Sequence, residues 1–162
     1  MHSRIFQLST QPISKADYIS DSNYYDHWFT HQIADYVNDE TNREHDIEWL
    51  SDCYKTKGVE FGKDESGEYL VVTSKGEYFK SKFDKFKEAI NKVTACGLDE
   101  FINGLSDLWY VNDAYEDKYG FYVDYSSDAD CYGSELMTFD SFVRMCNAGT
   151  KCYIGASIDY HF

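Results

Sequence analysis

The chain has 162 residues, of which 43% are apolar, so it can bury a core as a single domain and is not expected to be disordered. Its net charge of −14 argues against direct binding to nucleic acid or to an anionic membrane surface, since like charges repel. It shows neither a secretion signal nor a run of about 18 apolar residues, and its five cysteines form no Cys-x-x-Cys pair. We therefore expect a cytoplasmic protein with free thiols and no disulfide framework.

Hydrophobic spacing predicts the elements of the first half of the chain. They are a strand over residues 4–9, a helix over 25–38, a second helix over 39–55 and a β-hairpin over 58–76. Thr41 and Glu44 have the spacing of a capping box at the start of the second helix. Gly67 supplies the backbone freedom that the turn of the hairpin needs.

The second half is predicted to contain three helices and two strands. In order they are a helix over 77–93, a helix over 98–110, a strand over 120–126, a helix over 137–149 and a strand over 151–162. Each helix is expected to bury one apolar stripe. The stripes are Phe79, Phe83, Phe86, Ile90 and Val93; Phe101, Ile102, Leu105, Leu108 and Trp109; and Phe139, Phe142, Val143 and Cys146. The last strand alternates, which places Cys152, Ile154, Ala156, Ile158 and Tyr160 on one face.

These elements follow no regular βαβ order. We therefore predict an α+β fold in which residues 1–162 form a single acidic domain. Its four- to five-stranded antiparallel or mixed sheet is expected to be packed by four to five amphipathic helices.

Two histidines one helical turn apart, His27 and His31, indicate an alternative function. Imidazoles at this spacing can bind one metal ion, so a small metal-binding protein or a metal-dependent hydrolase is one interpretation. The glutamate that would act as general base between them is absent, and Asp35 lies about 12 Å from His27 along a helix axis. Because a zinc site needs three or four converging ligands, we favour an ordinary amphipathic helix.

The acids near residue 124 resemble a calcium loop only in part. With Asp128 and Asp130 in the first and third positions of such a loop, Tyr132 and Phe139 would take the fifth and twelfth, where neither can coordinate. An acidic loop without calcium is therefore expected. The chain also has no phosphate-binding glycine loop and no dinucleotide fingerprint, so no cofactor is predicted and catalysis is not favoured.

Charge is distributed unevenly along the chain. Residues 17–52 carry ten acids and one base, and residues 99–140 carry eleven acids and one base. Between them, residues 75–92 carry six lysines and three acids. Two acidic segments therefore flank a helix with a basic outer face, and a homodimer in which this helix meets an acidic segment of a second copy is one consequence to consider.

The leading prediction is a non-enzymatic interaction protein whose carboxylates engage a basic surface of a protein partner. Carboxylates on a rigid scaffold can imitate a phosphate backbone, so that surface would be one that binds nucleic acid. In charge and size the chain resembles small acidic proteins of phages and mobile elements that block restriction or CRISPR machinery, which implies a nucleic-acid-mimicking inhibitor. A structural or regulatory module without charge-driven binding is the remaining alternative.

The residues predicted to bind the partner come from both acidic segments. They are Asp35, Asp39, Glu40, Glu44, Glu48, Asp113, Tyr115, Glu116, Asp117, Tyr119, Asp124, Asp128 and Asp130. The carboxylates would present charge, and the two tyrosines would anchor the interface, as aromatic side chains often do.

Overall fold

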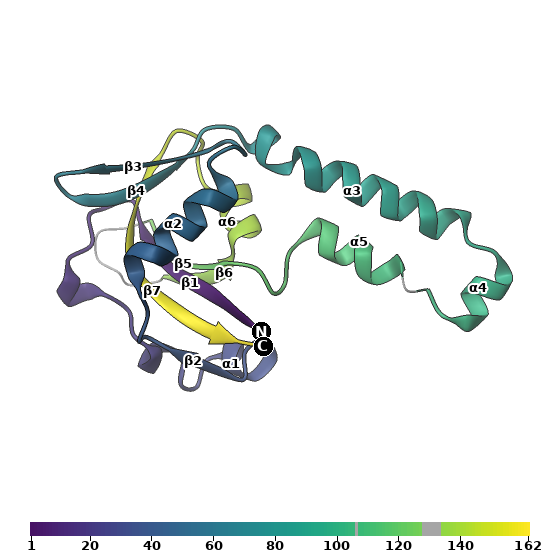
Figure 1. The fold of residues 1–162 in the computed structure, drawn as a ribbon, viewed down its shortest axis with the longest axis horizontal. Coiled ribbons are helices and arrows are strands. Elements are labelled where there is room, and N and C mark those ends of the chain that lie inside the picture. Colours follow the sequence, from purple (N-terminus) through teal and green to yellow (C-terminus); the bar gives the residue numbers. More distant parts are fainter. Residues whose placement is uncertain (106, 128–133) are drawn as a thin grey trace.

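The structure, a computed structural model, describes residues 1–105, 107–127 and 134–162. A body built on one sheet carries an arm of helices that projects to one side (Figure 1). The two termini lie side by side in the body. Within the described ranges, no helix combines the length and the apolar character needed to cross a membrane.

The described chain forms seven strands, six α-helices and two short 3-10 helices. The strands are β1 (His2–Ser9), β2 (Tyr36–Asn38), β3 (Val59–Asp64), β4 (Gly67–Val72), β5 (Tyr122–Ser126), β6 (Glu135–Thr138) and β7 (Lys151–His161). The α-helices are α1 (Trp28–Gln32), α2 (Arg43–Tyr54), α3 (Lys75–Ala95), α4 (Leu98–Asn103), α5 (Asp107–Tyr115) and α6 (Phe139–Met145), and the 3-10 helices cover Lys15–Asp17 and Asp21–Tyr24. The α+β class is confirmed. The sheet is larger than the predicted four to five strands, because the sequence does not predict β2 and β6.

The strands are arranged in the order β3-β4-β7-β1-β5-β6, and β2 is a further partner of β7. β4 pairs with residues 151–153 of β7, and β2 pairs with residues 159–161. β1 and β5 run parallel, whereas the other described pairs are antiparallel. The sheet is therefore mixed, which is one of the two predicted forms.

Hydrophobic clusters cover both faces of the sheet. The larger cluster packs α2, α6 and the start of α3 against one face, and it includes Leu50, Tyr78 and Phe142. The smaller cluster packs α1 against the other face, around Phe29 and Tyr122. The central strands are thus buried on both sides, which restricts the exposed surface of the body to its edges and to the outer sides of its helices.

A bulge in β7 changes which side chains face each cluster. Phe6 of β1 pairs with Ser157 and Leu8 pairs with Ile154, so two steps along β1 match three steps along β7. The extra residue shifts the alternation: Ile154 packs in the larger cluster, whereas Ile158 packs in the smaller cluster on the opposite face. The predicted single apolar face of this strand is therefore wrong beyond the bulge.

The predicted helix over residues 25–38 is much shorter in the structure. α1 covers only its middle, and Tyr36–Asn38 form β2, which pairs with the end of β7. Backbone N–H and C=O groups at the edge of a sheet offer ready partners for another strand. Pairing with β7 therefore outweighs the helical spacing of the apolar residues in this segment.

α2 confirms the predicted second helix but begins at a different cap. Asn42 is the N-cap, and its side chain accepts a hydrogen bond from the backbone N–H of His45. Thr41, the predicted cap, has its hydroxyl 2.8 Å from the Ser157 hydroxyl of β7, so it ties the segment before α2 to the sheet.

The predicted β-hairpin is confirmed as β3 and β4, and Gly67 at its turn has a φ of +133°.

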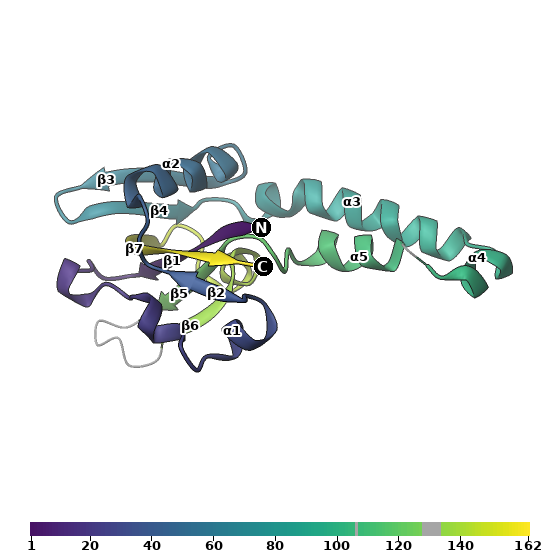
Figure 2. The same ribbon diagram turned by 60° about the horizontal axis from the view of Figure 1, so that its bottom comes forward.

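The arm consists of α3, α4 and α5, and apart from the start of α3 its helices lie outside the body (Figure 2). α3 confirms the predicted helix. The predicted helix over residues 98–110 is interrupted at Gly104, which follows α4 with a φ of +99°. Phe83 from the first predicted stripe and four residues of the second stripe are exposed, because the arm helices have mainly one another to pack against. Those stripes are therefore not buried as predicted.

α6 confirms the last predicted helix, with Thr138 as its N-cap. The Thr138 hydroxyl accepts a hydrogen bond from the backbone N–H of Ser141.

Cys146 and Cys152 are buried as predicted, and burial raises the pKa of the Cys152 thiol to about 12. The cysteines that the structure describes are all free thiols.

Replacing Gly58 with alanine is expected to lower the free energy of unfolding by about 2 kcal/mol, because this position combines a positive φ with a close backbone contact. Gly58 has a φ of +71°, and a Cβ atom there would lie 2.3 Å from the carbonyl oxygen of Ser74. Urea denaturation measures the change. Gly76→Ala, at an open position in the first turn of α3, is the control and is expected to be neutral or slightly stabilising. Equal stability of the Gly58→Ala protein and the wild type would contradict this account.

Candidate acidic interaction surface

Four exposed acids of the first acidic segment lie close together in α2 and just before it. We call them the α2 acidic face, and they are Asp39, Glu40, Glu44 and Glu48. All four are exposed, and the ion pairs between described residues in this region involve other acids. The α2 acidic face therefore carries charge that no neighbouring base neutralises by direct contact.

Helix geometry explains why Glu44 and Glu48 point to solvent. They are one turn apart, with about 6 Å between their Cβ atoms, whereas Ile47 and Leu50 face the larger hydrophobic cluster. Glu44 also lies in the first turn of α2, where the positive end of the helix dipole favours a carboxylate. The α2 acidic face is therefore held on a rigid element that is fixed to the sheet.

Other acids near α2 are paired with bases and stabilise the fold. Asp46 is buried, and Arg4 Nε donates a hydrogen bond to it at 2.9 Å. Glu68 of β4 lies 2.7 Å from Lys63 and 2.9 Å from Arg43. The hydrogen bonds from Lys63 and Arg43 lower the pKa of Glu68 to about 2. These carboxylates have partners within the chain and do not belong to the α2 acidic face.

Asp35 is exposed but has a partner in the chain. Its carboxylate lies 2.8 Å from Nδ1 of His161 in β7, and the hydrogen bond from His161 lowers the pKa of Asp35. The backbone N–H of Asp35 also donates a hydrogen bond to the carbonyl oxygen of His161. Asp35 therefore holds the start of β2 against the end of β7.

Two predicted site residues that follow α5 are turned toward the body. Glu116 accepts hydrogen bonds from the hydroxyl groups of Thr138 and Ser141, the latter at 2.6 Å. It thus binds the first turn of α6. Asp117 is half-buried, and desolvation raises the pKa of its carboxyl group. Neither residue presents a fully solvated carboxylate to a partner.

Asp124 lies in the body as well. It is buried in β5, and the Tyr24 hydroxyl donates a hydrogen bond to its carboxylate at 2.9 Å. Only 8% of Asp124 is exposed, so it offers little surface to a partner. Asp128 and Asp130, the other two residues predicted in this part of the chain, lie outside the described residues.

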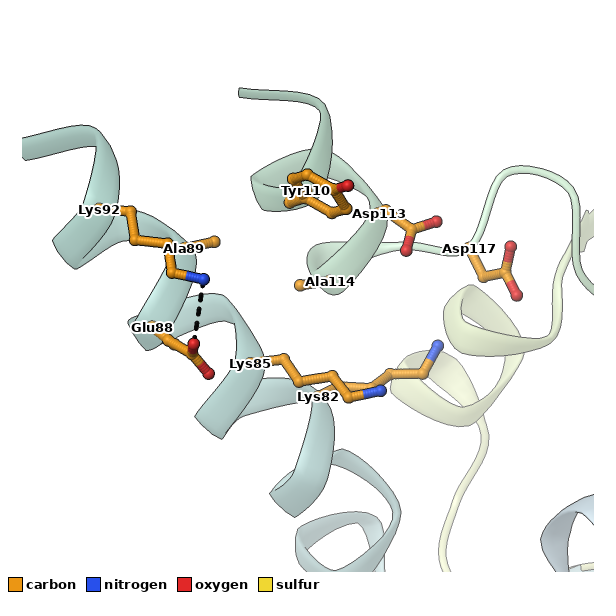
Figure 3. A pocket seen from close by; sticks show the side chains of 9 residues that line it. All are labelled: Lys82, Lys85, Glu88, Ala89, Lys92, Tyr110, Asp113, Ala114 and Asp117. Carbon is orange, nitrogen blue, oxygen red and sulfur yellow. Dashed lines mark ion pairs between the residues drawn. The ribbon is translucent and has the colours of Figure 1, made fainter. Parts of the chain in front are cut away.

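A groove of about 470 Å³ between α3 and α5 contains Asp113 (Figure 3). Its charged lining consists of Lys82, Lys85, Lys92, Glu88, Asp113 and Asp117. Lys82 is paired with Asp140 at 2.5 Å, and Lys92 is paired with Glu88 at 3.1 Å. Because lysines and acids alternate around the groove, it presents neither a negative surface nor an anion site.

The two predicted tyrosine anchors are exposed but contact other side chains. The guanidinium group of Arg144 lies 4.5 Å from the ring centre of Tyr115. The ring of Tyr119 stacks on Phe162, with 4.8 Å between the ring centres. Both tyrosines are distant in sequence from the α2 acidic face and contribute to the root of the arm and to the end of the sheet.

His27 and His31 do not lie on one helical face. His27 is the N-cap of α1, and its Nδ1 accepts a hydrogen bond from the backbone N–H of Phe29 at 3.3 Å. Among the residues that the structure describes, no three histidines, cysteines or acids are placed to share a metal ion. The shortening of α1 therefore removes the geometry on which the metal interpretation depends.

Comparison with known protein families, with curated proteins and with solved structures finds no match. The geometry of this chain is therefore the basis for any functional proposal. Among the described residues of the predicted site, the α2 acidic face is the group of exposed carboxylates that lie close together without a basic partner in direct contact.

Sequence reasoning missed Asp140, which joins the arm to the body. This carboxylate lies in the first turn of α6 and is buried. It accepts hydrogen bonds from the Tyr78 hydroxyl at 2.7 Å, from Lys82 Nζ at 2.5 Å and from the backbone N–H of Asp117 at 3.1 Å. In the sequence, Asp140 stands out only as an acid in the first turn of a predicted helix. That position indicates a favourable interaction with the helix N-terminus and does not indicate a contact with α3.

Proposed function

We propose that this protein is a non-enzymatic interaction protein whose α2 acidic face binds a basic surface of another protein. One observation supports the proposal above all. Within the described parts of the chain, four exposed carboxylates with no basic partner in direct contact fall within the ten residues 39–48, on and beside a helix that is fixed to the sheet.

The physical basis is electrostatic attraction between the α2 acidic face and lysine or arginine side chains of the partner. Such attraction acts over about 8 Å at physiological ionic strength and accelerates the encounter of the two proteins. The net charge of −14 adds a long-range field of the same sign. Binding is therefore expected to weaken as the salt concentration rises.

Neutralising the α2 acidic face is expected to reduce partner binding by about tenfold or more. The variant carries Asp39→Asn, Glu40→Gln, Glu44→Gln and Glu48→Gln. The protein is used to capture partners from its source cells, and the affinity of a recovered partner for the wild type and the variant is measured by titration calorimetry at several salt concentrations.

The control has the same change in net charge at exposed acids elsewhere. It carries Asp26→Asn, Glu60→Gln, Glu65→Gln and Asp84→Asn, all at exposed positions. We expect it to bind like the wild type apart from a small change in association rate. Equal losses in both variants would show that net charge alone matters and would refute a role for the α2 acidic face.

A partner surface that binds nucleic acid is the finer form of this proposal. Carboxylates one helical turn apart, such as Glu44 and Glu48, are spaced by about 6 Å and would occupy positions that phosphates take in a basic groove. Double-stranded DNA is then expected to displace the protein from its partner. If the partner binds DNA and this protein at the same time, mimicry is contradicted while the interaction surface is retained.

A further inference from the structure

The outer part of the arm, which comprises α4 and the start of α5, exposes large apolar side chains. We call these residues the apolar tip, and they are Leu98, Phe101, Ile102, Leu108 and Trp109. Each is between 51% and 74% exposed. The three residues from α4 have the spacing that places side chains on one helical face. α4 is the part of the arm farthest from the sheet (Figures 1 and 2).

The apolar tip is large enough to form a protein–protein contact. Aromatic side chains have roughly 150–250 Å² of surface each and large aliphatic ones somewhat less, so the two aromatic and three aliphatic side chains, all more than half exposed, offer about 500 Å² in total. Monomeric soluble proteins rarely expose a contiguous apolar patch of more than a few hundred Å². Two such tips would bury about 1,000 Å² together, which is at the lower limit for a specific interface.

The charge distribution allows a second copy of the chain to meet this surface, because the arm is nearly neutral. Residues 75–115, which form the arm, carry six lysines and seven acids and so have a net charge of −1. The rest of the chain carries the remaining nine bases and 22 acids, a net charge of −13. Two copies that met through their bodies would repel each other, whereas contact through nearly neutral arms keeps the acidic bodies apart.

We propose that two copies of this protein associate through their apolar tips, with the arms meeting about a two-fold axis and the bodies on opposite sides. In such a contact each tip covers the same residues of the other copy. The contact uses no residue of the α2 acidic face, which lies on the body, so a dimer would present two acidic faces. This inference does not depend on the proposed function.

Sedimentation velocity of the full chain over a wide range of protein concentration tests the proposal. The wild type is expected to shift from monomer to dimer as the concentration rises. Phe101→Ser combined with Ile102→Ser is expected to raise the dimer dissociation constant at least about tenfold. The substituted side chains are exposed, so the fold is retained, and circular dichroism verifies this. Tyr25→Ser, which removes a still more exposed aromatic side chain from the body, is the control and is expected to dimerise like the wild type.

Two further readouts separate this contact from charge-driven binding. Added salt is expected to leave the dimer unchanged or to strengthen it, because salt screens the repulsion between the acidic bodies. Amide hydrogen exchange in residues 98–103 is expected to slow as the protein concentration rises. A wild type that stays monomeric at all concentrations, or a double variant that dimerises as well as the wild type, would overturn the proposal.

Discussion

Replacing Asp140 with alanine is expected to lower the free energy of unfolding by about 3–5 kcal/mol, the range seen when one partner of a buried ion pair is removed. The substitution leaves Lys82, whose side chain is only 26% exposed, without its carboxylate partner. It also leaves the buried hydroxyl of Tyr78 without an acceptor. Urea denaturation measures the loss, and amide exchange in α3 and α5 is expected to accelerate because Asp140 contacts both sides of the arm root.

Asp113→Ala is the matched control for this experiment. Asp113 lines the same groove between α3 and α5 but is exposed, so its removal is expected to change stability by no more than about 0.5 kcal/mol. If Asp140→Ala were as mild as Asp113→Ala, the arm would have to be held to the body by its other contacts, such as those of Lys75 and Tyr115 with Arg144.

Replacing Phe29 with alanine is expected to lower the free energy of unfolding by a similar amount, about 3–5 kcal/mol, because it removes a fully buried aromatic ring from a packed cluster. The Phe29 ring lies edge-on to Tyr122 and Tyr160, with 4.7 Å and 5.0 Å between ring centres. The smaller hydrophobic cluster has few other large side chains from outside the sheet, so a cavity there cannot be filled easily. Chemical denaturation measures the effect.

Trp28→Ala, at the neighbouring position in α1, provides the comparison. Trp28 is 42% exposed, so its removal is expected to destabilise the protein much less than Phe29→Ala. This order of effects distinguishes the observed short α1 from the long amphipathic helix that the sequence predicts, since that helix would bury Trp28 and Phe29 together. Similar losses for the two variants would favour the long helix.

Local patterns in the sequence predict the elements whose stability is mainly local. α3, α6 and the β3–β4 hairpin follow from apolar spacing, a cap residue and a turn glycine, all of which act within a few residues. β2 could not be predicted in this way, because it has three residues and forms by pairing with β7, far away in the sequence. β6 has only four residues and pairs with β5, the preceding strand, so its apolar pattern is too short to indicate a strand. The interruption at Gly104 was indicated by the residue type, but the apolar stripe across it favoured a continuous helix.

In the candidate site as well, local sequence predicts only part of what the structure shows. The sequence shows how many acids each segment has, but it does not show which of them are paired. Asp46 is neutralised by Arg4, and Asp140 by Lys82, across 42 and 58 residues of sequence. Burial of Asp124 depends on contact with Tyr24, which is 100 residues away. Only the fold separates these structural carboxylates from the α2 acidic face.

The bulge in β7 makes the length of this strand a condition for folding. Removing one residue at the bulge would turn every later side chain of β7 toward the opposite face of the sheet. Ile158 and Tyr160 would then turn toward the polar groups around Asp46, while Asp159, the partner of Arg4, would enter an apolar cluster. We therefore expect that the fold does not tolerate insertions or deletions in this strand. It is expected to tolerate them in the turn between β3 and β4, where a change of length moves no buried side chain.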